Sequence, residues 1–164
     1  SVSLINVPEL FTGEPQTWAD LGCGEGTFTY ALDSLLGAGS SIHAVDTRPG
    51  RFEPLTAKGN HITALRKNFV FDDLHLPLLD GILMANSLHY VQDKKAFYPK
   101  LIQMLRPGGV LLLVEYDTDE PNRWVPYPIS WSKLKHRFTK IGQLPSMYQT
   151  AGMYGCYCKP FEAP

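Results

Sequence analysis

The sequence predicts an α/β domain in which helices cover both faces of a doubly wound, mainly parallel sheet. Three observations support this fold class: short apolar segments alternate with helical patterns, the connections between them are short, and polar residues directly follow the apolar segments. In such sheets ligands bind outside the carboxyl ends of the strands. The length of 164 residues fits one domain, so we expect residues 1–164 to form a single domain.

The first strand and the first helix flank a glycine-rich turn. Residues 17–21 are a short apolar run, and the turn occupies residues 22–26. Apolar residues then recur at three- and four-residue steps over residues 28–36, which predicts a helix. Gly37 and Gly39 end this helix, because glycine readily adopts the left-handed conformation that follows a helix.

Three more strands follow before residue 90. We expect the second strand over residues 42–45 and the third over residues 62–65, with a short helix over residues 52–57 between them. Residues 81–85 lack polar alternation, which is typical of a strand buried on both faces.

An amphipathic pattern over residues 93–105 predicts the next helix, and the Arg-Pro-Gly-Gly run at 106–109 ends it. Residues 110–116 form the fifth strand. The proline-rich segment 117–128 predicts a stiff loop, and Ser130 caps a short helix. We expect two closing strands over residues 138–141 and 154–158.

Composition and charge argue against several classes of partner. The formal net charge of −1 does not provide the basic surface that nucleic acid needs, and no apolar run is long enough to span a membrane. Residues 1–10 do not have the pattern of a signal peptide, so we expect a cytoplasmic protein. Cys23, Cys156 and Cys158 have no disulfide or zinc-site spacing, so we expect free thiols and no metal.

The glycine-rich turn favours a cationic ligand. Its Gly-x-Gly-x-Gly spacing differs from the dinucleotide fingerprint, and Asp20 lies directly before it. A carboxylate there suits an ammonium group better than a pyrophosphate. Asp46 ends the second strand, where a carboxylate can bind a ribose diol or cap the turn that begins at Thr47. A tight turn that binds no ligand is the alternative interpretation of the glycines.

Four segments together resemble a known family. They are WADLGCGEGT at 18–27, IHAVD at 42–46, DGILMANSLHYV at 80–91 and LRPGGVLLLVE at 105–115. In order and spacing they resemble the class I S-adenosylmethionine-dependent methyltransferases, and the resemblance covers roughly residues 15–116. It implies a Rossmann-like, seven-stranded sheet with a C-terminal antiparallel hairpin, S-adenosylmethionine as cofactor, S-adenosylhomocysteine as product and a small-molecule acceptor.

The resemblance also implies roles for individual residues. The methionine end of the cofactor is assigned to Asp20 and the turn, the ribose to Asp46 and Thr47, the adenine to Asn68 and Phe69, and the region near the sulfonium to Asn86 and Ser87. Asp72 is an alternative to Asn68 as the adenine contact. The expected cofactor-binding residues are therefore Asp20, Gly22, Cys23, Gly24, Asp46, Thr47, Asn68, Phe69, Asn86 and Ser87.

The acceptor site is expected beside the ends of the fourth and fifth strands. Methyl transfer from a sulfonium is an in-line displacement that requires alignment but no metal, covalent nucleophile or dedicated base. We therefore assign no catalytic residue, although His89, Glu115 and Tyr116 are candidate bases. The aromatic residues of the proline-rich loop either form a wall of the pocket or pack as a lid. The expected acceptor-pocket residues are His89, Glu115, Tyr116, Trp124 and Tyr127.

Two other functions compete with methyl transfer. One is an NAD-type oxidoreductase, which the glycine spacing and Asp20 argue against. The other is a non-catalytic S-adenosylmethionine-binding module or subunit. The short chain also leaves open an acceptor pocket that a second subunit completes, as in a homo-oligomer.

Overall fold

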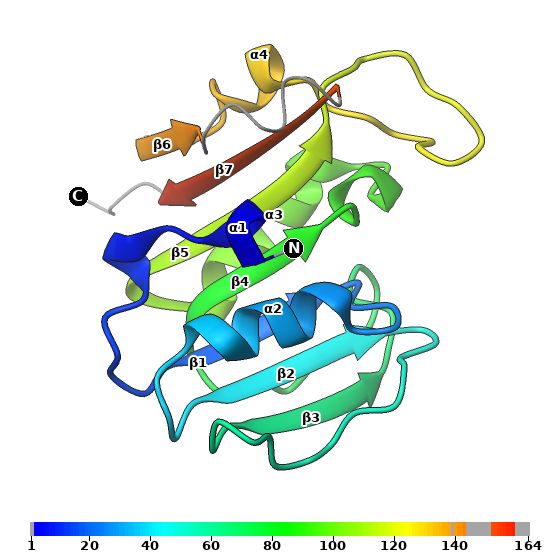
Figure 1. Cartoon of the computed structure of the whole chain (residues 1–164). Coiled ribbons are helices and arrows are strands. Elements are labelled where there is room, and N and C mark those ends of the chain that lie inside the picture. Colours follow the sequence, from blue (N-terminus) through cyan, green and yellow to red (C-terminus); the bar gives the residue numbers. More distant parts are fainter. Residues whose placement is uncertain (1, 139, 144–151, 160–164) are drawn as a thin grey trace.

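Seven strands form one sheet in the computed structural model, which describes residues 2–138, 140–143 and 152–159 (Figure 1). Their order is β3-β2-β1-β4-β5-β7-β6. The pairs from β3 to β5 are parallel, whereas β7 is antiparallel to both of its neighbours, so the predicted fold class and its closing hairpin are confirmed. The strands are β1 (Thr17–Leu21), β2 (Ser41–Asp46), β3 (His61–Arg66), β4 (Leu79–Ala85), β5 (Leu105–Tyr116), β6 (Lys140–Gln143) and β7 (Met153–Lys159).

Helices lie on both faces of this sheet (Figure 1). Alternate residues of β4 point to opposite faces: Leu83 belongs to the same apolar cluster as Leu32 of α2, and Met84 to the same cluster as Phe97 of α3. All four side chains are almost completely buried, and their burial stabilises the fold. The helical elements are α1 (Val2–Ile5), η1 (Pro8–Leu10), α2 (Thr27–Leu35), η2 (Leu88–Tyr90), α3 (Lys94–Met104) and α4 (Trp131–Leu134).

The helix expected over residues 52–57 is absent from the structure, where this segment is extended and ends in a turn. Pro54 has no N–H to continue a helix, and its carbonyl instead accepts a hydrogen bond from Ile62 at the start of β3. The Thr56 N–H donates to the carbonyl of Asn60, and the Thr56 hydroxyl donates to the buried carboxylate of Asp33 on α2. These bonds hold the crossover against β3 and α2 without a helix.

Three strands have boundaries that differ from the prediction by two or more residues, and one of them, β4, begins at residue 79 rather than 81. The fifth strand begins at residue 105 rather than 110, because the chain passes from α3 directly into β5 through an irregular pairing opposite Leu79 and Gly81. The first closing strand lies at residues 140–143 rather than 138–141, and residue 139 is outside the described part of the chain. In that described part, no helix is long and apolar enough to cross a bilayer.

The strand order places the reversal of the sheet between β1 and β4. The chain leaves β1 toward β2 and β3, then returns to the other side of β1 with β4. Connections from these two adjacent strands therefore diverge at their carboxyl ends, and this is where open α/β sheets bind ligands.

Candidate functional site

A pocket of about 930 Å³ opens at the carboxyl ends of these strands; we call it the main pocket. Many residues predicted from sequence line it, namely Gly22, Asp46, Thr47, Asn68, Phe69, Asn86, Ser87 and Tyr127. Sequence reasoning missed other lining residues from the loop after β3, from η2 and from α3. These are Lys67, Val70, Phe71, Tyr90, Gln92, Asp93, Ala96, Phe97 and Lys100.

The glycine-rich turn brings the backbone against the wall of the main pocket. Gly22 has a φ of +82°, and a Cβ built on it would lie 2.4 Å from the Cβ of Ser87. The N–H groups of Gly22 and Cys23 both donate to the carbonyl of Val45 at the end of β2. A side chain at position 22 would therefore both strain the turn and close the gap to β4.

Asp20 lies behind this turn rather than on the pocket surface, and it is 1% exposed. Its carboxylate accepts a hydrogen bond of 2.7 Å from the Thr29 hydroxyl on α2. The pKa of Asp20 is raised from 3.8 to about 7, because burial and, to a smaller extent, the nearby charge of Asp46 raise it by more than the Thr29 hydrogen bond lowers it. A cation bound at the turn would favour the ionised form of this carboxyl group.

Cys23 is also buried in the turn, and Gly24 follows it. Burial, together with the charges of Asp20 and Asp46, raises the pKa of the Cys23 thiol to about 12. The thiol therefore stays protonated at neutral pH and is not a nucleophile. Among the described residues, no group of three or more His, Cys, Asp and Glu side chains is placed to hold a metal ion.

Asp46 joins the glycine-rich turn to its own loop. One carboxylate oxygen accepts a 2.9 Å bond from the N–H of Gly24, and the other accepts a 2.8 Å bond from the N–H of Arg48. The capping interaction considered from sequence is thus present. Each oxygen retains a further lone pair, and Asp46 lines the main pocket, so capping leaves room for a ligand donor.

The loop after β3 is ordered by its own side chains and by α3. The Asn68 side-chain oxygen accepts bonds from the N–H groups of Val70 and Phe71, and the Asp72 carboxylate accepts one from the N–H of Asn68. The Lys100 ammonium donates to the carbonyls of Phe69, Val70 and Asp72. The structure places Asn68 and Phe69 on the wall of the main pocket and Asp72 outside that wall.

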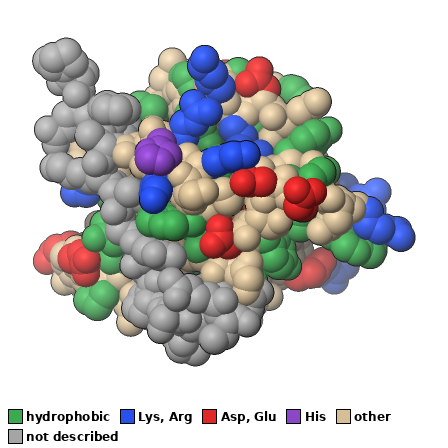
Figure 2. All heavy atoms as spheres, turned by 90° about the horizontal axis from the view of Figure 1, so that it is seen from above, with side chains coloured by type: hydrophobic (Ala, Val, Ile, Leu, Met, Phe, Trp, Pro, Cys, Tyr) green, Lys and Arg blue, Asp and Glu red, His purple; other side chains and the backbone are tan. Residues whose placement is uncertain are grey.

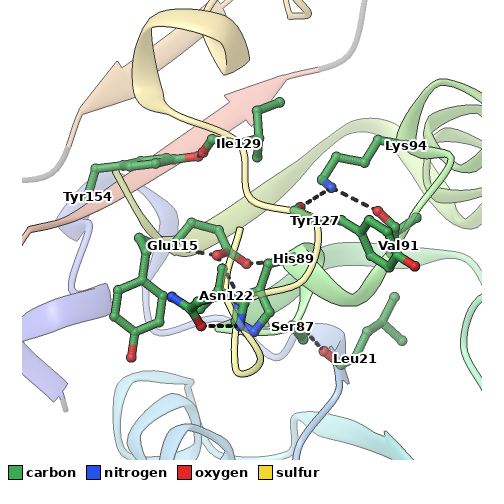
Figure 3. Close-up of polar contacts among 12 residues, drawn as sticks. Leu21, Ser87, His89, Val91, Lys94, Glu115, Asn122, Tyr127, Ile129 and Tyr154 are labelled. Carbon is green, nitrogen blue, oxygen red and sulfur yellow. Dashed lines mark hydrogen bonds and ion pairs between the residues drawn. The ribbon is translucent and has the colours of Figure 1, made fainter. Parts of the chain in front are cut away.

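Asn86 and Ser87 follow β4 and form the wall opposite the turn. Asn86 has a left-handed backbone with φ 57°, and its N–H donates to the carbonyl of Val114. Its side-chain oxygen is buried and has no hydrogen-bond partner among the described residues. The Ser87 hydroxyl donates to the carbonyl of Leu21, which fastens β4 to β1 (Figure 3). The unsatisfied Asn86 oxygen marks a position where a ligand donor would restore a hydrogen bond.

His89 and Glu115 form a buried pair (Figure 3) that does not line the main pocket, although His89 lies in the chain between the lining residues Ser87 and Tyr90. The Nδ1 atom of His89 lies 2.8 Å from one oxygen of Glu115, and the backbone N–H of His89 donates to the other oxygen at 3.1 Å. The side chains are 3% and 0% exposed. A carboxylate on Nδ1 favours the tautomer with its proton there, so Nε2 carries the lone pair. Sequence reasoning named both residues but did not predict that they pair.

Aromatic side chains surround this pair. The His89 ring lies 4.4 Å from that of Tyr90 and 6.1 Å from that of Tyr116, between ring centroids. The N–H of Tyr127 donates to the carbonyl of His89, which brings the proline-rich loop to the pocket. The structure does not bring Trp124 there: this ring is 67% exposed and stacks with the guanidinium of Arg123.

Comparisons with known proteins agree with this geometry. A family model described as a methyltransferase domain matches residues 19–111. An uncharacterized methyltransferase of Mycobacterium tuberculosis is 34% identical over 106 residues, which cover 65% of this chain and 42% of that protein. A ubiquinone/menaquinone biosynthesis C-methyltransferase of Shewanella piezotolerans is 31% identical over 107 residues, covering 59% of this chain and 41% of that protein.

Solved structures show the same fold. A 1,6-didemethyltoxoflavin-N1-methyltransferase of Burkholderia thailandensis, with bound 1,6-didemethyltoxoflavin and S-adenosylhomocysteine, superposes with a TM-score of 0.66 and 23% sequence identity. The match covers 96% of this chain and 74% of that one. In contrast, the aligned segments span only about two fifths of the curated relatives named above.

Proposed function

We propose a function from the premise that this chain belongs to the class I S-adenosylmethionine-dependent methyltransferase family, whose domain model matches residues 19–111. The domain catalyses transfer of the methyl group to a small-molecule acceptor by in-line displacement. When bound, the cofactor supplies an activated methyl group on a sulfonium. The main pocket, which is lined by most of the predicted cofactor residues and by the rings of Tyr90 and Tyr127, is the observation that carries this proposal.

The residues of the main pocket fit this cofactor. Gly22 leaves the wall free of a side chain, and Asn86 presents a buried oxygen without a partner among the described residues. Asp20 supplies a negative charge behind the turn once it ionises, which suits the cationic methionine end. Asp46 retains lone pairs for the ribose hydroxyls. The pocket volume of about 930 Å³ is within the range of small-molecule sites.

We assign the adenine end to the loop after β3. The Asn68 side-chain oxygen already accepts two backbone N–H groups, so its role is to shape this loop as well as to line the pocket. Lys100 fixes the same loop from α3 by binding three of its carbonyls. Phe69 is then held in place as an apolar wall, with its ring 5.8 Å from that of Phe97.

The His89–Glu115 pair is the general base in this proposal. An acceptor hydroxyl, amine or acidic C–H group must lose a proton on methylation, and Nε2 of His89 is the ring nitrogen able to take it. Glu115 then stabilises the imidazolium, because its carboxylate is buried and lies 2.8 Å from Nδ1. This pairing assigns catalysis to one residue and orientation to the other.

A small acceptor is consistent with the relatives and with the charge. Two of the named proteins are a ubiquinone/menaquinone biosynthesis C-methyltransferase and a 1,6-didemethyltoxoflavin-N1-methyltransferase. We propose one domain, because the seven-stranded sheet is continuous across the described residues. A formal net charge of −1 gives no support for a nucleic-acid acceptor, and a homo-oligomer stays compatible with this proposal.

Two measurements test the proposal. Calorimetric titration with S-adenosylhomocysteine, with NADH as a parallel control, should give micromolar binding of the former alone. Labelled S-adenosylmethionine should then transfer its methyl group to members of a panel of small hydroxyl, amine and 1,3-dicarbonyl compounds. Binding without transfer to any acceptor would favour the non-catalytic module, and selective NADH binding would overturn the cofactor assignment.

A matched pair of histidine variants tests the base. His89→Gln should lower transfer about 10²- to 10⁴-fold, the usual contribution of a general base, while S-adenosylhomocysteine affinity stays the same. His61→Gln is the control, because His61 is exposed on β3, away from the pocket. Equal activity of the two variants would show that His89 is not the general base.

A further inference from the structure

A second hollow adjoins the main pocket and has a different chemistry. It has a volume of about 700 Å³, and we call it the cation-lined hollow. Gln92, Asp93 and Tyr127 line both cavities, so these three residues form a common wall. This wall therefore lies between a ligand seated in the main pocket and the hollow.

Positive charge predominates around this hollow although the whole chain carries a net charge of −1. Figure 2 shows several Lys and Arg side chains and a histidine on the face seen from above, with Asp and Glu side chains beside them. The Lys, Arg, His and acidic residues that line the hollow are Lys94, Lys95, Lys133, His136 and Arg137 with Asp93 and Asp119.

The two carboxylates are already engaged by the fold. Asp93 accepts the N–H of Ala96 as the N-cap of α3. Asp119 accepts both the N–H and the hydroxyl of Ser130, and it lies 3.4 Å from the ammonium of Lys133. The acids of the hollow are thus used to hold helix ends and one lysine.

Two of the cations remain without such a partner. Among the described residues, neither Lys95 nor Arg137 has a carboxylate within 4.0 Å of its charged nitrogens. Lys94 is different, because its ammonium donates to the carbonyls of Val91 and Tyr127 (Figure 3). Lys95 and Arg137 are therefore the cations available to a ligand, and Lys94 fixes the shared wall.

Tyr98 adds an unsatisfied donor beside these cations. Its hydroxyl is buried and has no hydrogen-bond partner among the described residues, while its ring packs edge-on against Phe138. Burial raises the pKa of Tyr98, so the phenol keeps its proton and can donate to an anion.

We infer that the cation-lined hollow binds an anionic group, a carboxylate or a phosphate, of the methyl acceptor whose reacting end lies in the main pocket. This inference rests on the proposed function and specifies its substrate class. Tyr127 in the wall shared by the cavities is 38% exposed, and Tyr90, which lines the main pocket, is 58% exposed. The acceptor is accordingly amphiphilic: an apolar or aromatic body crosses Tyr127, and the anion is held by Arg137 and Lys95.

Calorimetry with matched probes tests this class without knowledge of the true acceptor. The protein saturated with S-adenosylhomocysteine is titrated with phenylacetate, 3-phenylpropionate and phenyl phosphate, and with the neutral amides of the two carboxylates. At least one anion should bind about tenfold or more tightly than both amides, as expected for hydrogen bonds to a charged group. The preferred anion distinguishes a carboxylate from a phosphate.

Charge variants locate the binding. Arg137→Gln and Lys95→Gln should each weaken binding of the tightest-binding anion about tenfold and leave the affinity for the amides unchanged. Lys135→Gln makes the same change of charge at an exposed residue outside the hollow and should have no effect. Anions that bind no better than amides, or equal effects of all three variants, would overturn the inference. S-adenosylhomocysteine binding is measured in every sample, so its loss would instead identify a failure of the proposed function.

Discussion

Replacing Asp20 with asparagine should change how the stability of the fold depends on pH. Asp20 is 1% exposed, and its pKa is raised from 3.8 to about 7, chiefly by burial. A shift of this size corresponds to about 4 kcal/mol of destabilisation once the carboxyl group is ionised in the folded protein. Asparagine has nearly the same shape and can accept the Thr29 hydrogen bond, but it carries no charge.

The direction follows from the protons bound in each state. Below about pH 4 the Asp20 carboxyl group is protonated in both states, so it does not change the free energy of unfolding with pH. Between pH 4 and pH 7 the unfolded chain loses the proton while folded Asp20 keeps it, so each pH unit lowers the free energy of unfolding by about 1.4 kcal/mol. Above pH 7 Asp20 is ionised in both states, and the loss is complete.

Urea denaturation of the wild type and Asp20→Asn at pH 5, 6, 7 and 8 measures this effect. The free-energy difference between the two proteins should move by about 3 kcal/mol in favour of the variant from pH 5 to pH 8 and then level off. Other titrating groups cancel, since both proteins contain them. Thr29→Val removes the hydroxyl that lowers this pKa and should move the plateau to higher pH, whereas Thr29→Ser should not. Parallel curves for wild type and Asp20→Asn would refute the reasoning.

Four other predictions concern the pocket and the core. S-adenosylhomocysteine affinity should fall up to about tenfold per pH unit below pH 7 and be flat above pH 8, because cation binding favours ionised Asp20; calorimetry at pH 6, 7 and 8 tests this. Asp46→Ala should weaken binding of S-adenosylhomocysteine by about 1–3 kcal/mol, and unchanged affinity would show that Asp46 does not bind the ribose. Gly81→Ala should destabilise the fold by about 1–3 kcal/mol in urea, since the added Cβ would lie 2.4 Å from the buried ring of Trp18. Trp124→Ala should change the free energy of unfolding by no more than about 0.5 kcal/mol and turnover by no more than about twofold, because the ring is exposed outside the pocket. A large loss of turnover with unchanged stability would instead show that Trp124 contacts the acceptor.

The strands and their polar ends could be predicted because local sequence determines them. The apolar runs of β1, β4 and β5 need no knowledge of their neighbours, and the glycine-rich turn is specific in its spacing. The crossover at residues 52–57 could not be predicted in the same way. Its course depends on hydrogen bonds from Thr56 to Asp33 and Asn60, which come from other parts of the chain.

The contacts between side chains distant in sequence could likewise not be predicted. His89 and Glu115 are 26 residues apart and meet because β4 and β5 are adjacent, yet position at a strand end does not specify which way each side chain turns. Lys100 was missed because a lysine on an amphipathic helix normally faces solvent. Here it donates to three carbonyls of a loop that begins some 30 residues earlier.

The position of α3 limits how this protein can acquire new specificity. Through Lys100 the helix fastens the loop at one side of the main pocket, and through Lys94 it fastens Tyr127 at the boundary with the hollow. Any tilt or slide of α3 would disturb both attachments together. We therefore expect divergence toward other acceptors to proceed by exchanging side chains along a stationary helix.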